Sequence, residues 1–252
     1  TRSVISELVD KKQASRNFEI IGEHLLHPDG VRLMSEPAHY AGGVSTHFKR
    51  AEQAANFGRE VGLQYVHAHI RYIEALAKIG DKSAWHMLDV INPINIKEVV
   101  PNAALRQSNT YFSSSDAAFL DRYQAQNEFS RVKEGSIPVK GGWRIYSSGP
   151  GIYLHQLISS VLGIRQTEET LIFDPILPEE LDGLECHIEL DNYPLDLTFE
   201  SSDEGCIVVN GEKQPVENAA NLYRTGALIL PKKNLTTKCS QITIKFQKNN
   251  RL

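Results

Sequence analysis

Apolar residues in the first two thirds of the chain recur at the spacing of an α-helix. Between residues 61 and 79 these positions are Val61, Tyr65, Ala68, Tyr72, Leu76 and Ile79. Steps of three and four residues place them on one face of a helix. Gly80 and Asp81 follow and are typical of a helix end. A helix is therefore predicted over residues 61–79.

Three further helices are predicted in this part of the chain. One covers residues 82–90 and stops before Asn92 and Pro93, because a residue before proline is pushed out of the α region. Another begins near Ser113, where neighbouring serines can serve as N-cap and Asp116 falls in the first turn. The last runs from about residue 151 to 162 and ends at Gly163.

After about residue 165 the apolar residues alternate with polar ones, which predicts strands with one buried face. The expected strands cover residues 186–190, 195–199, 206–209, 228–230 and 242–246. Asn210 and Gly211 form a strong hairpin signal after the third of them. We therefore expect a mainly α part, residues 1–165, followed by an all-β part, residues 166–252, that folds as a β-sandwich.

Two long stretches of the helical part show no regular period, namely Pro28 to Ser45 and Glu128 to Gly142. Long irregular loops are uncommon in compact domains unless they carry function. These stretches are rich in Gly, His, Tyr, Ser and Arg. We expect them to bind polar ligands, and we expect the β part to be structural.

Composition limits the classes of function. The 252 residues carry a formal net charge of −4, which argues against a nucleic-acid partner because such proteins need a basic face. The three cysteines have neither metal-binding spacing nor an even disulfide set, which favours a reducing compartment. Without an export signal or a long apolar run, the sequence predicts a cytoplasmic protein and no membrane span.

Short catalytic motifs are few in this sequence. His67 and His69 are two residues apart, so a helix would turn them to different sides and they could not share a metal ion. We therefore expect no metal site there, and one of the two is expected to be a core histidine. The sequence contains no G-x-S-x-G elbow, Walker motif or G-x-G-x-x-G fingerprint, which argues against nucleotide-dependent classes.

The segment GGWRIYSSGPG has the composition of an anion site. Ser147 and Ser148 stand just before Gly149, Pro150 and Gly151, which are expected to open a helix. Backbone N–H groups at a helix start, together with the helix dipole, attract anions. The nearby Arg144 could add a positive charge. An ordinary capped turn remains the alternative.

Four segments together resemble the C-terminal part of the inverting glycoside phosphorylases related to cellobiose phosphorylase. In chain order they are Leu33 to Tyr40, Arg59 to Asp81 with Ile91-Asn92-Pro93 behind it, Gly141 to Arg165, and Leu171 to Glu185. They are similar to the family's L-x-x-P-x-Y loop, its R-E-N-G-x-Y-x-H-A helix followed by I-N-P, its W-x-Y-T-G-S-A-G-W segment with L-G-I-R, and its D-P-x-L-P tail. The resemblance covers nearly all of residues 30–200.

The chain departs from the family at several positions. The family's Glu-Pro-Tyr is replaced by Ser108-Asn109-Thr110-Tyr111, the Asn after Glu is Val61, and Thr-Gly is Ser147-Ser148. This variant resembles the branch that acts on β-1,2-linked glucooligosaccharides.

The resemblance implies a fold and a reaction. The fold would be the last helices of an (α/α)₆ barrel followed by a jelly-roll-like β-sandwich. The reaction would be reversible phosphorolysis of a β-glucosidic bond, with inversion, to give α-glucose 1-phosphate. Inorganic phosphate would be the co-substrate, and no cofactor would be needed.

The resemblance also implies roles for individual residues. His67, Ser147 and Ser148 fall on phosphate-binding positions, and substrate contacts are expected at Tyr111, Asp116 and Arg144. The family's general acid is an aspartate in a W-N-D-type segment, and neither Trp85 nor Trp143 is followed by Asn-Asp.

We therefore expect the acid, and the remaining N-terminal part of the enzyme, outside this chain, which alone would be inactive. Asp116 and Asp121 are the candidates within it, although helix capping explains both. Two other functions stay open: a non-catalytic carbohydrate-binding segment and a phosphorylase-like module of a cyclic glucan synthase. The oligomeric state is also open, with a homodimer as one alternative.

Overall fold

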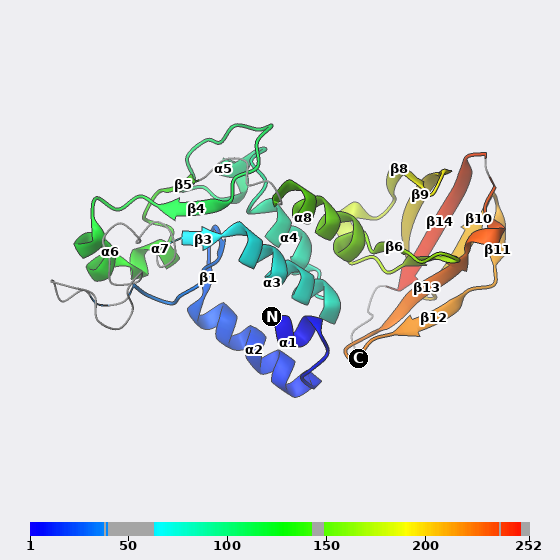
Figure 1. Cartoon of the computed structure of the whole chain (residues 1–252), viewed down its shortest axis with the longest axis horizontal. Helices are drawn as coiled ribbons and strands as arrows, with labels where there is room; N and C mark the ends of the chain where they lie inside the picture. Colours follow the sequence, from blue (N-terminus) through cyan, green and yellow to red (C-terminus); the bar gives the residue numbers. More distant parts are fainter. Residues whose placement is uncertain (38, 40–62, 143–148, 237, 248–252) are drawn as a thin grey trace. The chain divides into compact units, whose positions relative to one another are not determined.

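The computed structural model describes residues 1–37, 39, 63–142, 149–236 and 238–247 (Figure 1). Backbone contacts divide the chain into two compact units. The helical unit consists of residues 1–2, 12–73 and 86–153, and the β-rich unit consists of residues 3–11, 74–85 and 154–252. Each unit is built from stretches that are distant in sequence. The predicted domain boundary at residue 165 stays a prediction.

Eight α-helices are found in the described residues. They are α1 (Arg2–Ile5), α2 (Lys11–His24), α3 (Val66–Ile79), α4 (Ser83–Asp89), α5 (Ile96–Val99), α6 (Arg122–Glu128), α7 (Ser130–Lys133) and α8 (Gly149–Gln156). A turn of π-helix, Leu157–Val161, continues α8. Short 3₁₀ helices cover Glu179–Leu181 and Lys232–Asn234.

The described strands form four sheets. Strands β1 (Leu26–His27) and β2 (Gly30–Val31) make a small hairpin, and β3 (Leu63–Tyr65), β4 (Ser114–Ala117) and β5 (Val139–Gly141) make a three-stranded sheet. The other two sheets lie in the β-rich unit. Their strands are β6 (Ile164–Gln166), β7 (Thr170–Phe173), β8 (Leu184–Leu190), β9 (Tyr193–Ser202), β10 (Cys206–Val209), β11 (Glu212–Gln214), β12 (Glu217–Ala220), β13 (Thr225–Pro231) and β14 (Ser240–Gln247).

The prediction of a helix over residues 61–79 is wrong at its start. Residues 63–65 form strand β3, which pairs with β4, and the helix begins only at Val66. Helical spacing of apolar residues could not reveal this short strand, because its partner lies far away in sequence. The helix does end before Gly80, whose φ of 80° is the left-handed conformation typical of a helix end. The predicted helix over residues 82–90 is confirmed as α4.

The prediction of a helix starting near Ser113 is also wrong. Residues 114–117 form β4, the central strand of the three-stranded sheet, so Asp116 does not cap a helix. The helix begins at Arg122, after Asp121, whose carboxylate accepts hydrogen bonds from the backbone N–H of Tyr123 and Gln124 at 2.9 Å. Buried pairing with two strands has overridden the capping signal of the serines.

The stretch from Glu128 to Gly142 is more regular than predicted. It contains helix α7 and strand β5. β5 pairs with β4 in register Ser115↔Gly141 and Asp116↔Lys140. The other predicted loop, Pro28 to Ser45, also contains a regular element, because strand β2 lies within it.

The β-rich unit contains a five-stranded sheet, in the order β11-β10-β14-β9-β8, and a four-stranded sheet, in the order β12-β13-β7-β6. Figure 1 shows β9, β14 and β10 running side by side. β9 and β14 are parallel, and the other described neighbours are antiparallel. The predicted hairpin is confirmed, because Asn210 and Gly211 both have positive φ and connect β10 to β11.

The two larger sheets share one hydrophobic core. The alternating residues Leu195, Leu197 and Phe199 of β9 and Ile242, Ile244 and Phe246 of β14 are at most 3% exposed. They pack in one cluster with Phe173 of β7 and Leu228 of β13. Each such side chain contributes about 1.5–3 kcal/mol on burial. The prediction of a helical part followed by a β-rich part is confirmed at this level.

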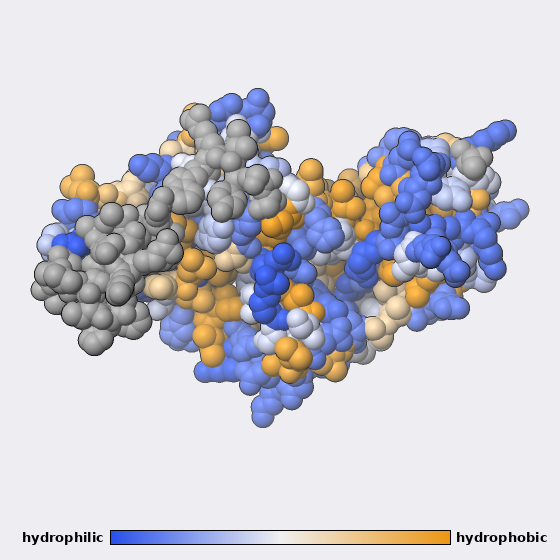
Figure 2. Space-filling model, in the orientation of Figure 1, coloured by the Kyte–Doolittle hydropathy of each residue, from blue (hydrophilic) through white to orange (hydrophobic). Residues whose placement is uncertain are grey.

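The face of the β-rich unit seen in Figure 2 is mainly hydrophilic, with apolar residues between the polar ones. This agrees with the burial of β14, in which inward and outward positions alternate. None of the described helices combines the length and the apolar character needed to cross a membrane.

Candidate functional site around His67 and Tyr111

His67 lies in the first turn of α3, directly after strand β3. The junction is held by the backbone N–H of Val66, which donates to the carbonyl oxygen of Ser113 at 3.0 Å. The imidazole of His67 is half-buried and stacks on the ring of Tyr65, with centroids 5.2 Å apart. This strand-to-helix junction therefore fixes the position of a predicted phosphate-binding residue.

Tyr111 meets the other side of this histidine. Its ring stands edge-on to the imidazole at a centroid distance of 6.1 Å, and its hydroxyl lies 3.4 Å from Nδ1 of His67. Burial raises the pKa of Tyr111, and the nearby Tyr65 adds to this. Tyr111 is therefore a neutral phenol that can donate its hydrogen, and the structure brings together two of the predicted site residues.

The charge state of His67 follows from its surroundings. Burial lowers the pKa of His67, and the positive charge of Arg71 lowers it further. The imidazole is therefore mainly neutral at pH 7. A neutral imidazole has one N–H donor and one acceptor nitrogen. When the Tyr111 hydroxyl donates to Nδ1, the ring proton is on Nε2.

The predicted residues Arg144, Ser147 and Ser148 lie outside the described residues. Both flanks of their segment are described. On one side, the N–H of Gly142 donates to the carbonyl oxygen of Ser114 at 3.0 Å. On the other, Gly149 lies so close to the Tyr111 ring that a Cβ at this position would overlap it. Gly149 thus connects the start of α8 to the His67–Tyr111 pair.

Helix α8 begins as predicted, with Gly149, Pro150 and Gly151 as its first residues. Proline suits the first turn of a helix because its missing N–H would have no partner there. Gly163 ends the helical segment, which the π-helical turn extends beyond α8, and its φ of 69° is left-handed.

Asp116 lies in β4, opposite Leu63 of β3 and Lys140 of β5. Its carboxyl group is close to Gly142, since a Cβ on that glycine would be 2.7 Å from Oδ2. Burial raises the pKa of Asp116, while a hydrogen bond from Ser114 opposes this. The atom Oδ1 is buried and has no hydrogen-bond partner among the described residues.

A buried charged network, which the sequence analysis missed, lies beside Asp116. Nη2 of Arg32 donates to both carboxylate oxygens of Asp29, at 2.8 and 3.0 Å. Ser115 Oγ donates to Asp29 Oδ2 at 2.5 Å and accepts from Arg106 Nη2 at 3.0 Å. Because Ser115 precedes Asp116 in β4, this network fixes the strand that carries Asp116. No local pattern linked the Asp29–Arg32 pair to Ser115, which lies 86 residues after Asp29.

His69 is the core histidine that was expected. Its side chain is fully buried; Nδ1 accepts from the N–H of Val31 at 3.0 Å, and Nε2 lies 2.8 Å from the carbonyl oxygen of Met87. Burial lowers its pKa to about 4. Both ring nitrogens are used, so His69 has a structural role.

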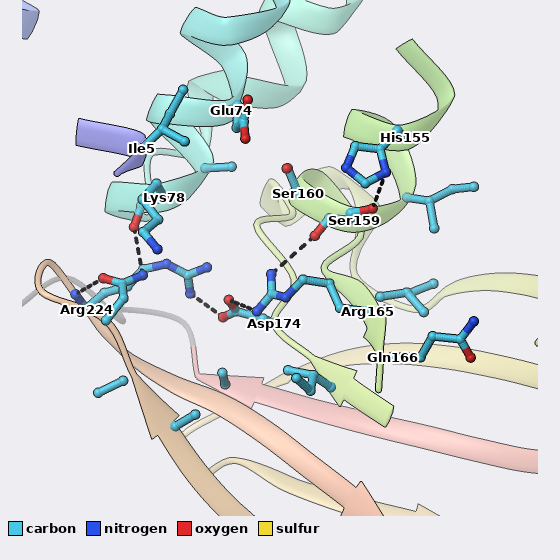
Figure 3. A pocket seen from close by; sticks show the side chains of 18 of the residues that line it. Ile5, Glu74, Lys78, His155, Ser159, Ser160, Arg165, Gln166, Asp174 and Arg224 are labelled. Atoms are coloured by element: carbon cyan, nitrogen blue, oxygen red, sulfur yellow. Dashed lines mark hydrogen bonds and ion pairs between the residues drawn. The ribbon is translucent and has the colours of Figure 1, made fainter. Parts of the chain in front are cut away.

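The β-rich unit contains a cavity of about 780 Å³ with both apolar and charged lining residues, which the sequence analysis did not anticipate (Figure 3). Arg165 Nη2 donates to Asp174 Oδ2 at 2.8 Å, and the almost fully buried Arg224 binds the other carboxylate oxygen. His155 Nδ1 lies 3.1 Å from Ser159 Oγ at the same cavity. Ser159 belongs to the π-helical turn, a feature often found at functional sites.

Two of the motif segments meet at this cavity. Arg165 comes from the L-G-I-R segment and Asp174 from the D-P segment, and Gly163 lies between them against the Asp174 backbone. The N–H of Asp174 donates to the Gly163 carbonyl oxygen at 2.9 Å. These motif residues therefore join the helical segment to β7.

Comparison with known proteins finds a family that matches part of the β-rich unit. Residues 163–246, which are most of the β-rich unit, match the family described as the glycoside phosphorylase C-terminal domain. The predicted resemblance to the glycoside phosphorylases is therefore confirmed for this segment, which contains the last of the four motifs.

Individual relatives make the resemblance more specific. Over its whole length the chain is 98% identical to a 1,2-β-oligoglucan phosphorylase of Listeria innocua serovar 6a, and it spans 23% of that protein. It is also 24% identical, over 191 residues, to the cyclic β-(1,2)-glucan synthase NdvB of Rhizobium meliloti. That match covers 75% of the chain and 6% of the synthase. The chain thus spans less than a quarter of each of these two relatives.

Proposed function

We propose that this chain is the C-terminal part of a phosphorylase acting on β-1,2-linked glucooligosaccharides, and that it supplies residues of the phosphate pocket. The observation that carries the proposal is the 98% identity to a 1,2-β-oligoglucan phosphorylase along the entire chain. The close arrangement of His67, Tyr111 and Gly149 supports the assignment of the pocket.

In the proposed reaction, inorganic phosphate attacks the anomeric carbon of the terminal glucose from the face opposite the leaving group. A carboxylic acid protonates the oxygen of the departing chain, as in other inverting reactions of glycosides. The products are α-glucose 1-phosphate and a shortened oligosaccharide. Phosphate replaces the water and its general base, so one catalytic carboxyl group suffices, and we place it outside this chain.

His67 would donate its Nε2 proton to a phosphate oxygen. The Tyr111 hydroxyl, 3.4 Å from Nδ1, holds the required tautomer, and stacking on Tyr65 holds the plane of the ring. The phosphate is ionised, so this hydrogen bond would be charge-assisted although the imidazole itself is neutral.

Ser147 and Ser148 would add hydroxyl and N–H donors just before the start of α8, where the helix dipole also attracts an anion. Arg144 would contribute a charge. Tyr111 and Asp116, both half-buried, would contact glucose hydroxyls, as the resemblance to the family implies.

The proposal also covers the fold of the complete enzyme, its location and its oligomeric state. The described helices would be the last ones of an (α/α)₆ barrel, and the two sheets with one core support a β-sandwich. Exposed apolar side chains such as Leu105 and Leu120, 83% and 91% exposed, would be covered by the remaining part of the enzyme. The proposed reaction needs no cofactor. The complete enzyme would be cytoplasmic and would form a homodimer.

The pocket assignment is tested by phosphorolysis kinetics of the complete protein. His67→Ala and Ser147→Ala should each raise KM for phosphate about ten- to a hundredfold, since a hydrogen bond to a charged group contributes about 1.5–3 kcal/mol. KM for the oligosaccharide should change far less. His24→Ala, at an exposed histidine of α2, is the matched control.

Equal increases in both Michaelis constants would reject the phosphate assignment but leave the phosphorylase proposal intact. Failure of the unmodified protein to release glucose 1-phosphate from any β-linked glucooligosaccharide would reject the phosphorylase itself.

A second candidate is a phosphorylase-like module of a cyclic glucan synthase, which the match to the Rhizobium meliloti protein favours. The two candidates differ in the size of the complete protein, because the chain spans 6% of the synthase and 23% of the phosphorylase. The much higher identity to the phosphorylase makes it the leading candidate.

A further inference from the structure

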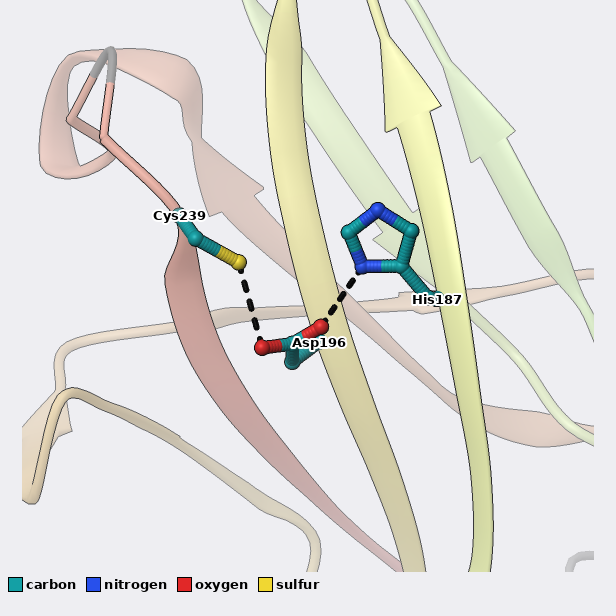
Figure 4. A group of neighbouring side chains, drawn as sticks. All are labelled: His187, Asp196 and Cys239. Carbon is teal, nitrogen blue, oxygen red and sulfur yellow. Dashed lines mark hydrogen bonds and ion pairs between the residues drawn. The ribbon is translucent and has the colours of Figure 1, made fainter.

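Three different metal-binding side chains meet on the surface of the β-rich unit (Figure 4). They are His187 of β8, Asp196 of β9 and Cys239, which directly precedes β14. One ligand atom of each lies within 4.8 Å of the other two. His187 Nδ1 is 2.6 Å from Asp196 Oδ1, and Cys239 Sγ is 3.1 Å from Asp196 Oδ2.

The register of the sheet explains why these residues share a face. His187 is directly opposite Asp196 in the antiparallel β8–β9 pair, and Asp196 is opposite Gln241 in the parallel β9–β14 pair. Cys239 is two residues before Gln241, so an extended chain turns both to the same side. The neighbours of Asp196, Leu195 and Leu197, are buried in the core, so this face points outward.

The cysteine is unusual in its position. Free cysteine is among the most buried residue types in proteins, yet Cys239 is exposed. Its thiol points toward Asp196 (Figure 4). A surface thiol beside a carboxylate and an imidazole has the donor chemistry of a transition-metal site.

We propose that His187, Asp196 and Cys239 bind a zinc ion. Zinc accepts sulfur, imidazole nitrogen and carboxylate oxygen together, whereas magnesium and calcium prefer oxygen alone. Three protein ligands leave a fourth position for water. The site would link β8, β9 and the start of β14 on the outer face of the sheet, so bound zinc should stabilise the sheet.

Zinc binding would require only small movements of the three side chains. Around a tetrahedral zinc ion with bonds of about 2.0–2.3 Å, ligand atoms lie about 3.3–3.7 Å apart. The measured separations of 2.6 and 3.1 Å, with none above 4.8 Å, bracket that range. All three side chains are exposed and can change rotamer without disturbing the core. No sequence pattern indicated this site, because the three ligands are separated along the chain and only strand pairing brings them together.

The test measures Zn²⁺ affinity of the complete protein by competition with a chromophoric chelator, and uses Co²⁺ as a spectroscopic probe. Cobalt bound to the Cys239 thiolate should show a sulfur-to-metal charge-transfer band. Cys239→Ser, His187→Gln and Asp196→Asn should each weaken the site more than about a hundredfold, because losing even a second-shell partner costs ten- to a hundredfold. Excess Zn²⁺ should also raise the melting temperature of the unmodified protein, but not of these variants.

Cys206→Ser and His155→Gln are the matched controls, since both residues lie outside the cluster, and neither should alter the affinity. The proposal is overturned if the three cluster variants bind Zn²⁺ as tightly as the unmodified protein, or if the cobalt band survives Cys239→Ser. Because the controls report on folding and on other thiols, loss of binding in them as well would also contradict the site.

Discussion

His67 and His69 lie two residues apart on α3 and have different environments. His67 is half-buried between two tyrosine rings, whereas His69 uses both ring nitrogens for backbone hydrogen bonds inside the protein. The sequence predicted that the two rings could not share a ligand, because a helix rotates by about 200° over two residues. It could not predict which one was structural, since that depends on Val31 and Met87.

His69 makes the stability of the protein dependent on pH. Its pKa is about 4 in the folded protein and about 6.5 when unfolded, so the unfolded state binds protons more strongly between these values. The stability it contributes is therefore full above pH 6.5 and is lost as the pH falls toward 4, by about 3 kcal/mol in total. Urea unfolding at several pH values checks this.

His69→Gln is the informative variant, because glutamine keeps one donor and one acceptor but does not titrate. The variant should be less stable at pH 7 and should lack the part of the pH slope that His69 causes. An unchanged slope between pH 6.5 and 4 would contradict the assignment.

Among the secondary-structure elements, sequence patterns predicted best where one face is buried by near neighbours. Alternation correctly placed strands β8, β9, β10, β13 and β14, and Asn210-Gly211 correctly placed the hairpin. The patterns failed at β3 and β4, because these strands are stabilised by pairing with each other across a large sequence distance. Ser114 and Ser115 carry polar side chains into a buried strand, which no amphipathic pattern reveals.

For the candidate site, too, the sequence predicted some residues and missed others. Motif resemblance selected His67, Tyr111 and Asp116, and the structure gives each a defined environment, but their functional roles stay predictions. The bonds from Asp29 to Ser115 and from Asp174 to Arg224 were missed, because each joins residues that are distant in sequence. Such networks depend on tertiary packing and carry no local sequence signal.

The junction between the π-helical turn and β7 depends on Gly163. Its φ is 69°, and an added Cβ would overlap the backbone of Asp174. Gly163→Ala should therefore cost more than about 2 kcal/mol, since a left-handed conformation alone costs an alanine about 1–2 kcal/mol. Chemical denaturation of the complete protein measures this change.

Gly211→Ala provides the matched control. Gly211 also has a positive φ, of 87°, but no atom lies within 4 Å of its added Cβ. This variant should cost only about 1–2 kcal/mol. Equal losses in the two variants would show that the close approach to Asp174 is unimportant.

At the scale of the whole molecule, the β-rich unit is larger than its strands. It includes residues 3–11 and 74–85 in addition to residues 154–252. Glu7 forms an ion pair with Lys78 at 2.5 Å and accepts from the N–H of Leu222 at 3.1 Å. The side-chain amide of Asn221 donates to the carbonyl oxygen of Lys78 at 3.1 Å. The matched family segment, residues 163–246, therefore lacks part of the unit in which it folds.

Tyr223 tests this dependence directly. Its side chain is 4% exposed, and its hydroxyl donates to the carbonyl oxygen of Val9 at 2.7 Å. Tyr223→Phe keeps the ring but leaves that carbonyl without this donor, so it should reduce the free energy of unfolding by about 1–2 kcal/mol. Tyr123→Phe, at a tyrosine that is 53% exposed, should change it by less than about 0.5 kcal/mol. Urea titrations of both variants, followed by tryptophan fluorescence, provide the comparison. If Tyr223→Phe is as stable as Tyr123→Phe, the N-terminal segment does not support the β-rich unit through this bond.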